Sequence, residues 1–473
     1  MAINEGPSRR AFLSASAASA AAIALPAAGT ASAEPAPQSG PGHQALPQQP
    51  ERALREALRE VDPARIEATI QGLVSFGTRH TLSSQDDPVR GIGAARDWIL
   101  AQLQQHAAPS GGRMTVELQS YVQEPTPRIP VPTRITNVVA TLRGDTEPNR
   151  VYVVTGHYDS RVTDILDFTS DAPGADDDAS GVAAVMEMAR IMATRRTKAT
   201  IMFVAVAGEE QGLFGSTFLA GQLKAAGADV QGAFSNDIIG TGNALDGTGA
   251  DPRTVRLFVE GVPTSETAAQ AATRRSVGGE NDGPSRQLAR FVTDVAQNED
   301  TGMTVRVVWR RDRYLRGSDH IPFLQQAYPA GRFTEPRENF AHQHQNTRVE
   351  GGVQFGDLID FCDFDYIARV TRVNLATLWS LALGPGTPVN LRILTSQLTN
   401  STTLVWNRTG DADTAGYQVL WRETTEPDWT HVIDVGDVTT ATIDLSKDNV
   451  QFGVRAVDSH GRRGPAAFPV PAS

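Results

Sequence analysis

The segment Val151-Tyr-Val-Val-Thr-Gly156 runs directly into His157-Tyr158-Asp159, and it decides the fold class. A short continuous apolar run of this kind is typical of a strand that is buried on both faces of a sheet. A second run, residues 201–207, leads into Gly208-Glu209-Glu210, and a weaker third run ends at Asn236-Asp237. Ligands of open α/β sheets bind at the carboxyl ends of the strands. We therefore expect these strands to bring imidazole and carboxylate groups to one edge of a sheet.

Several segments between and after these strands have the apolar spacing of helices. The run that starts at Ala179-Ser-Gly-Val places apolar residues three and four positions apart, as do residues 91–103 and 366–383, and this spacing predicts amphipathic helices. Further strands are expected near residues 114–121 and 134–143. The alternation predicts a three-layer α/β/α domain with a mixed, mainly parallel sheet.

The strand ends and the loops that follow them carry the ligand types of a two-metal hydrolase. These residues are His157, Asp177, Glu210 and Asp237, together with His344 or, as an alternative, His342 far downstream. Zinc binds imidazole nitrogen and carboxylate oxygen, and a catalytic zinc site keeps one position for water. Two divalent ions carry about four positive charges, which the three carboxylates and one hydroxide would cancel. We therefore expect two zinc ions.

Two further carboxylates accompany the predicted ligands. Glu209 stands beside Glu210, and neighbouring side chains in a strand or turn point in different directions. Glu209 can therefore face the attacking water as the general base, a role that needs a pKa near the working pH. Asp159 lies two residues after His157 and shares its face in an extended chain. We count Asp159 with the catalytic residues, as the group that orients the imidazole.

Taken singly, each of these features has a simpler explanation. A lone histidine at a strand end is usually packed or exposed at the surface. The acidic run Asp176-Asp177-Asp178 is typical of a helix start, where Asp is favoured. Paired glutamates alone would indicate a solvated turn. The order of strand, acidic loop, helix, strand and paired glutamates is what favours a metal site.

Several stretches resemble those of the secreted bacterial di-zinc aminopeptidases, the family that includes the leucine aminopeptidases. They are Gly156-His-Tyr-Asp-Ser160, Gly174-Ala-Asp-Asp-Asp-Ala-Ser-Gly181, Ala207-Gly-Glu-Glu-Gln-Gly-Leu-Phe-Gly-Ser216, Asn236-Asp237, Gly317-Ser-Asp-His-Ile-Pro-Phe323 and His342-Gln-His344. The resemblance spans roughly residues 65–383, and the acidic run with its small neighbours is its most specific part.

The resemblance implies a role for each residue. Asp177 would bridge both ions, His157 and Asp237 would bind one ion, and Glu210 and the late histidine would bind the other. Glu209 would take a proton from the bridging water and pass it to the leaving amine. The implied activity is that of a secreted zinc aminopeptidase, which hydrolyses the N-terminal bond of peptide or protein substrates.

The resemblance also implies a cis peptide bond between Asp177 and Asp178. The sequence offers two candidates, His342 and His344, for the late histidine ligand. Family spacing favours His342, whereas the order His344-Gln345 before an amide matches closer relatives, and we place the ligand at His344. His320 is expected to shape the cleft wall without touching metal.

Other activities share this fold, and fold alone does not fix function. Carboxypeptidases and glutaminyl cyclases are the alternatives within it. A cyclase uses one zinc, whereas the five ligand types favour two ions and hydrolysis. An inactive, peptidase-like binding protein is the alternative from another class. Such a protein would be expected to have lost Glu209 or Asp177, and both are present.

Composition bounds the partners and the location. The net charge of −11 comes without a basic stripe, which argues against nucleic-acid binding. Ser8-Arg9-Arg10-Ala11-Phe12-Leu13 resembles a twin-arginine export signal, and Ala31-Ser32-Ala33 offers a cleavage site. We expect residues 1–33 to be a signal peptide of a secreted or periplasmic protein, with no stable membrane insertion after its removal.

With 473 residues, the chain is too long for one ordinary domain. Residues 34–50 are rich in Pro, Gln and Ala and are predicted to be a disordered linker. The peptidase domain would span residues 51–384. Short alternating strands over residues 385–473 predict a β-sandwich, which resembles a fibronectin type III module at Trp406 and Tyr417. This tail is a candidate for binding a polymer or a surface.

Overall fold

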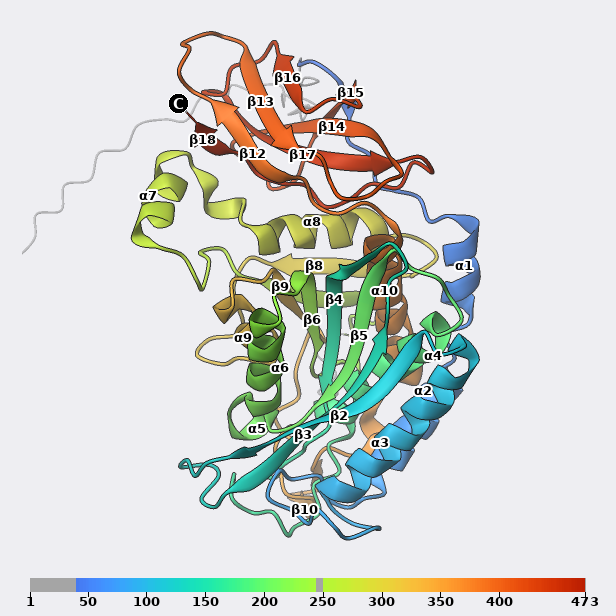
Figure 1. Cartoon of the computed structure of the whole chain (residues 1–473). Coiled ribbons are helices and arrows are strands. Elements are labelled where there is room, and N and C mark those ends of the chain that lie inside the picture. Colours follow the sequence, from blue (N-terminus) through green and yellow to red (C-terminus); the bar gives the residue numbers. More distant parts are fainter. Residues whose placement is uncertain (1–39, 244–249, 473) are drawn as a thin grey trace, which may run out of the picture. The chain divides into compact units, whose positions relative to one another are not determined.

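One large mixed sheet forms the centre of the molecule, and helices cover both of its faces (Figure 1). The structure, a computed structural model, describes residues 40–243 and 250–472. Eight strands form the sheet in the order β2-β3-β5-β4-β6-β9-β7-β8. Their bounds are β2 (Met114–Gln123), β3 (Thr133–Leu142), β4 (Glu147–His157), β5 (Ala199–Val206), β6 (Asp229–Asn236), β7 (Thr254–Val259), β8 (Thr304–Val308) and β9 (Ala330–Thr334).

The middle of the sheet is parallel. Strand β4 pairs in parallel with β5 and with β6, and β6 pairs in parallel with β9. Antiparallel pairs join β2 to β3, β3 to β5 and β7 to β9. The predicted α/β fold with a mixed sheet is therefore confirmed.

Helices pack on the two faces of this sheet. Their bounds are α1 (Arg52–Arg59), α2 (Pro63–Val74), α3 (Ile92–Ala107), α4 (Gly181–Met192), α5 (Glu209–Gly212), α6 (Phe214–Ala225), α7 (Ala268–Ser276), α8 (Pro284–Ala296), α9 (His320–Gln325) and α10 (Phe364–Leu383). Short turns and a hairpin complete the domain, namely η1 (Ala108–Ser110), η2 (Ala175–Ser180), η3 (Gly279–Asn281), η4 (Ile359–Phe361), β10 (Arg348–Glu350) and β11 (Val353–Phe355).

Strand β4 shows how the layers are held together. Tyr152 and Val154 belong to the core that includes α2, α4 and α10, whereas Val151 and Val153 belong to the core that includes α6 and α9. Alternate residues of a strand point to opposite faces, so this strand is buried on both sides. Each large apolar side chain buried in this way contributes about 1.5–3 kcal/mol. The continuous apolar run in the sequence is the result.

The C-terminal region is a β-sandwich of two four-stranded sheets, with the orders β1-β15-β14-β17 and β16-β13-β12-β18. The bounds are β1 (His43–Gln44), β12 (Val389–Leu394), β13 (Thr402–Asn407), β14 (Thr414–Glu423), β15 (His431–Gly436), β16 (Thr440–Ile443), β17 (Val450–Asp458) and β18 (Val470–Ala472). Trp406, Tyr417 and Phe452 lie in its core. The predicted sandwich is therefore present, and its likeness to a fibronectin type III module stays a prediction.

The predicted disordered linker over residues 34–50 does not hold for residues 41–50. His43 and Gln44 pair with β15, the Trp421 indole donates to the Pro41 carbonyl at 2.8 Å, and the Gln48 amide donates to the Asp294 carbonyl at 3.0 Å. Composition indicated disorder because it does not reveal that a distant strand offers a free edge. The predicted signal peptide, residues 1–33, and residues 34–39 lie outside the described residues.

The described residues from Pro41 onwards form one compact unit. Arg150, in β4, donates to both Asp411 oxygens at 2.8 Å and to the Gly384 carbonyl at 3.0 Å. Both charged side chains are buried, with exposures of 4% and 1%. The predicted domain boundary at residue 384 therefore lies beside a buried ion pair, and it stays a prediction.

Membrane-spanning length is a separate question. Within the described ranges, none of the helices has both the length and the apolar character that a membrane crossing requires.

Candidate metal centre

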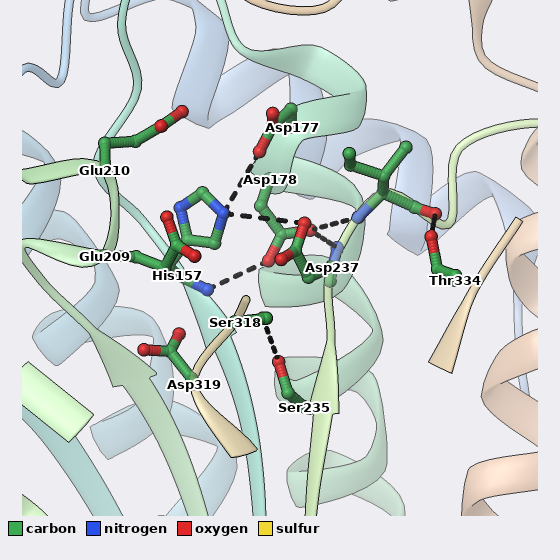
Figure 2. A network of polar contacts seen from close by, with 12 residues as sticks. His157, Asp177, Asp178, Glu209, Glu210, Ser235, Asp237, Ser318, Asp319 and Thr334 are labelled. Atoms are coloured by element: carbon green, nitrogen blue, oxygen red, sulfur yellow. Dashed lines mark hydrogen bonds and ion pairs between the residues drawn. The ribbon is translucent and has the colours of Figure 1, made fainter. Parts of the chain in front are cut away.

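The predicted site residues of three strands meet at the carboxyl edge of the sheet. His157 is the last residue of β4, Glu209 and Glu210 begin α5 directly after β5, and Asp237 follows β6. The parallel register places the strand ends side by side, since Gly156 aligns with Ala205 in β5. Figure 2 shows Asp177 and Asp237 directed at the His157 ring.

Two glycines make this approach possible. Gly208 has φ +74° and turns the chain from β5 into α5, a conformation that glycine adopts without steric cost. Gly181 begins α4, and a Cβ there would lie 2.4 Å from the Asn236 carbonyl oxygen. The glycine therefore lets α4 pack directly against the end of β6.

Six side chains form two groups, and within each group the possible ligand atoms all lie within 4.8 Å of one another. We call His157, Glu209 and Asp237 the first group, and Asp177, Glu210 and His344 the second group.

Asp177 belongs to the second group but also faces the histidine of the first group. Its Oδ1 is 3.1 Å from His157 Nε2, and its Oδ2 is 2.9 Å from His344 Nε2. The same His344 nitrogen is 2.9 Å from Glu210 Oε1. Each oxygen of Asp177 therefore faces the histidine of a different group, which is the arrangement that a bridging carboxylate needs.

The acidic loop that carries Asp177 is held from both ends. The peptide bond between Asp177 and Asp178 is cis, as the resemblance predicted. Asp178 accepts the amide hydrogens of His157 at 2.9 Å and of Gly181 at 3.0 Å. Asp357 accepts those of Asp176 at 2.9 Å and of Asp177 at 2.8 Å. Asp357 was not predicted, because it lies 180 residues downstream in no motif.

Asp159 lies beside the His157 imidazole, and its backbone carbonyl is closer to the ring than its carboxylate. The His157 Nδ1 is 3.1 Å from the backbone carbonyl of Asp159 and 3.7 Å from its carboxylate. The carboxylate accepts the amide hydrogens of Glu209 at 3.3 Å and of Glu210 at 3.1 Å. The carbonyl therefore faces the imidazole, while the carboxylate fixes the start of α5. Burial raises the pKa of Asp159, and His157 opposes that rise.

The structure separates the histidines that the sequence left open. His344 lies in the second group. The His342 ring instead stacks on Phe361, with 3.7 Å between the ring centroids, and burial lowers its pKa. His320 Nε2 lies 2.7 Å from the Arg311 carbonyl, outside both groups.

The charges of the cluster depend strongly on one another. Burial lowers the pKa of His157, but Asp178, Asp177 and Asp237 outweigh burial and raise it well above the ordinary value. His344 behaves alike, since Glu210 and Asp177 outweigh burial and raise its pKa to about 10. Without metal, the surrounding carboxylates therefore favour the protonated form of both imidazoles. Binding a metal would displace their protons.

The paired glutamates differ in their surroundings. Burial raises the pKa of Glu209 well above its ordinary value, and Asp237 and Glu210 add to that rise. Burial also acts on Glu210, but His344 outweighs it and lowers the pKa. Glu209 is therefore the carboxylate that binds a proton more readily.

Two arginines that the sequence did not single out contact the groups. Arg332, in β9, lies 3.1 Å from Asp237 Oδ1. Arg161 Nε donates to Glu210 Oε2 at 2.8 Å, and Arg161 Nη2 lies 2.5 Å from His344 Nδ1. Each group therefore has one guanidinium beside a carboxylate.

The donor set fits two zinc ions. Each group offers one imidazole and carboxylate oxygens, which are zinc ligands. His157 Nε2 and Glu210 Oε1 are buried and lack a hydrogen bond of good geometry among the described residues. A cleft of about 620 Å³ opens onto Asp177, Glu209, Glu210 and Asp237, so a substrate could reach both groups.

An α/β domain with paired groups of histidine and carboxylate ligands at its strand ends has the architecture of a metallohydrolase. Residues 137–350 match Peptidase family M28. A probable zinc metalloprotease of Leptosphaeria maculans is 55% identical over 422 residues, which cover 89% of this chain and 98% of that protein. One from Pyricularia oryzae is 53% identical over 443 residues, which cover 92% and 88%. The chain belongs to peptidase family M28.

Solved structures are similar at lower identity. The LapA aminopeptidase of Legionella pneumophila is 19% identical with a TM-score of 0.49, over 70% of this chain and 74% of that chain. The glutaminyl cyclase of Fimbriiglobus ruber is 20% identical with a TM-score of 0.48, over 70% and 97%. The two metalloprotease relatives named above are fungal proteins, so the predicted family holds without its bacterial restriction.

Proposed function

We propose that this chain is a two-zinc exopeptidase that hydrolyses the N-terminal bond of peptides. The observation that carries the proposal is the placement of Asp177, whose two oxygens face one histidine of each group at 3.1 and 2.9 Å. A carboxylate in this position can serve two ions at once.

The ligand roles follow from the two groups. His157 and Asp237 would hold one ion, Glu210 and His344 would hold the other, and Asp177 would serve both. When bound, two zinc ions of this kind supply Lewis acidity and lower the pKa of water. The contacts of Arg332 with Asp237, and of His344 and Arg161 with Glu210, favour the ionised carboxylates that metal ligands require.

Glu209 is left for proton transfer. It is half-buried and lines the cleft, and its raised pKa moves it toward the range that suits a general base. It would take a proton from the attacking water and deliver it to the leaving amine. Asp159 supports this role because its carboxylate accepts the Glu209 amide hydrogen at 3.3 Å.

Location and partners are part of the same proposal. The Arg9-Arg10 motif supports export through the twin-arginine route, so the enzyme would be secreted or periplasmic. Peptides or proteins are the proposed substrates. The sandwich of residues 385–473 is proposed as a fibronectin type III-like module that binds a polymer or surface.

The test combines a metal count with a substrate panel. Purified protein is loaded with zinc, its zinc content is measured, and it is offered aminoacyl amides, N-blocked peptides with a free C-terminus, and peptides with N-terminal glutamine. The proposal expects two zinc ions per chain and hydrolysis that requires a free N-terminus. Cleavage of N-blocked peptides alone would indicate a carboxypeptidase, and cyclisation of glutamine with one zinc would indicate a cyclase.

A further inference from the structure

Four arginines line the cleft above the two groups. They are Arg128, Arg161, Arg313 and Arg316. The only acidic residues among the cleft-lining side chains of the described chain are Asp177, Glu209, Glu210 and Asp237, and all of them belong to the two groups. Outside the two groups, the described residues that line the cleft therefore include arginines and no carboxylate.

Two of these arginines lie beside Glu210. Arg128, in the loop between β2 and β3, donates to the Glu210 carbonyl at 3.1 Å and is exposed. Arg161 donates to the Glu210 carboxylate at 2.8 Å. The hydrogen bond of Arg128 is to a neutral carbonyl, so it does not neutralise the guanidinium charge. That charge is available to a ligand in the cleft.

The other two arginines share one carboxylate. Arg313 and Arg316 lie 2.7 and 3.0 Å from Glu338 Oε2, and Arg256 lies 3.1 Å from Glu338 Oε1. Arg313 also contacts Asp312, which in turn pairs with Arg332. Around Glu338, three guanidinium groups face one carboxylate, so positive charge is in excess on this wall. Arg316 is 34% exposed, the most accessible of the three.

The floor of the cleft does not cancel this excess once metal is bound. Two divalent ions carry about four positive charges, which balance the four carboxylates of the floor. A basic side chain of the substrate that reached these arginines would then face cationic walls. A carboxylate would be attracted, since a guanidinium offers paired donors that match carboxylate geometry.

We propose that the cleft selects peptides that carry a carboxylate close to the scissile bond, and that Arg128 and Arg316 determine this selectivity. The carboxylate could be an acidic side chain or a free terminal carboxylate, which present the same chemistry. This inference rests on the proposed peptidase function and adds a substrate class to it.

The test uses the full chain loaded with zinc and a matched peptide set. A Glu peptide and a Gln peptide, both amidated, isolate the side chain. The same Gln peptide with a free C-terminus isolates the terminal carboxylate. The inference expects kcat/KM to be about tenfold higher or more for at least one carboxylate peptide, because hydrogen bonds to charged groups contribute this much. The arm that shows the preference identifies the source.

Variants assign the preference to the arginines. Arg128→Gln and Arg316→Gln should each reduce the ratio of carboxylate to neutral kcat/KM by about tenfold. Arg310→Gln is the matched control, because Arg310 lies in the same loop as Arg316, is exposed, and contacts Tyr314 at 3.1 Å without lining the cleft. It should leave the ratio unchanged. Equal kcat/KM for all three peptides, or an unchanged ratio in both cleft variants, would overturn the inference.

A binding measurement separates this inference from the proposed function. Calorimetry on zinc-loaded Glu209→Gln protein compares the affinities of the same peptides without turnover. If the wild type cleaves none of them and the carboxylate peptide still binds about tenfold tighter, the peptidase proposal fails and the selectivity stands. If neutral peptides are cleaved and bind as tightly as the carboxylate ones, the selectivity fails and the peptidase proposal stands.

Discussion

The two metal-ligand groups are built from different kinds of structure. The first group draws its histidine and Asp237 from the ends of β4 and β6, and the His157 side chain is 1% exposed. The second group depends on the acidic loop and on the segment after β9, and the His344 side chain is 22% exposed. Loops are more mobile and more exposed than the sheet that supports them. The first group is thus preformed by the fold, whereas the second depends on loop positions.

Charge adds to this difference. Arg332 contacts only Asp237 in the first group, whereas Arg161 contacts both Glu210 and His344 in the second. Arg161 contacts Glu210 Oε2 and His344 Nδ1, not the Oε1 and Nε2 atoms that face each other, so its positive charge opposes a second cation by repulsion. We therefore expect the second ion to be held more weakly and to exchange faster.

Removing the bridging carboxylate of Asp177 should weaken zinc binding and have the largest effect on turnover. Asp177→Asn replaces a carboxylate that serves two ions by a neutral amide, which is a poorer ligand for a divalent metal. We expect loss of at least one zinc ion and a fall in kcat of more than about 10⁴, beyond the usual range for a lost acid–base group. Metal analysis and turnover of the same preparation measure both effects. Two tightly held zinc ions in this variant would rule out the bridge.

Replacing the general base should leave both zinc ions bound. Glu209→Gln should lower kcat by about 10²–10⁴ because proton transfer is lost, while zinc content stays at the wild-type value. Glu210→Gln is the matched control, since it should lose the second ion. If Glu209→Gln is the variant that loses zinc, the roles of the two glutamates are exchanged.

Variants of the two late histidines, His344 and His342, should differ in their effect on zinc affinity. His344→Ala should weaken zinc binding at the second group by about 10–100-fold, the size of effect seen even for residues that only support a metal ligand, and leave the first group loaded. His342→Ala removes a ring that stacks on Phe361 and should change zinc affinity less than threefold, within about the ±0.5 kcal/mol of a typical surface change. Zinc titrations of both variants decide the point, and equal small effects would place the ligand elsewhere.

Zinc affinity should rise with pH. His344 has a pKa raised to about 10 in the metal-free protein, and zinc must displace its proton. Each displaced proton changes the apparent affinity by up to about tenfold per pH unit. The stability that the protonated imidazole gives the metal-free fold is complete below about 6.5 and is lost as pH rises through about 10. Zinc titrations from pH 6 to 8 with proton-release calorimetry test this, and an affinity independent of pH would contradict it.

The contact with the sandwich should affect stability without affecting metal. Asp411→Ala leaves the buried Arg150 without its partner, and breaking a buried pair costs about 3–5 kcal/mol. We expect a lower free energy of unfolding in denaturant titrations and unchanged zinc content. Asp437→Ala is the control, since Asp437 pairs with Arg408 at the surface. A lost zinc ion in Asp411→Ala would mean that the sandwich shapes the site.

The strand-held part of the site was the part that sequence could predict. Apolar runs ending in His157, Glu209-Glu210 and Asp237 predict a shared edge because parallel strands align their ends. Residues supplied by distant loops leave no such pattern. Asp357 contacts the site from a distant loop and stands in no recognisable motif. Arg161 lies only four residues after His157, but nothing in the sequence shows that it faces Glu210 and His344.

The same limit applies away from the site. His342 and His344 differ by two positions, and only the folded chain separates them, because it stacks His342 on Phe361 and places His344 beside Asp177 and Glu210. Residues 41–50 were predicted to be disordered because the segment is rich in Pro, Gln and Ala. In the structure, His43 and Gln44 pair with the edge strand β15. The fold class depended on periodicity and was predicted in full.

X-ray diffraction of zinc-loaded crystals, measured at the zinc absorption edge, tests the central claim most directly. The account predicts two anomalous peaks about 3.5–4 Å apart, one beside His157 and Asp237 and the other beside Glu210 and His344. The Asp177 carboxylate should lie between them, with Glu209 outside both ligand shells. A single peak, or a peak with Glu209 at ligand distance in place of Glu210, would contradict the account.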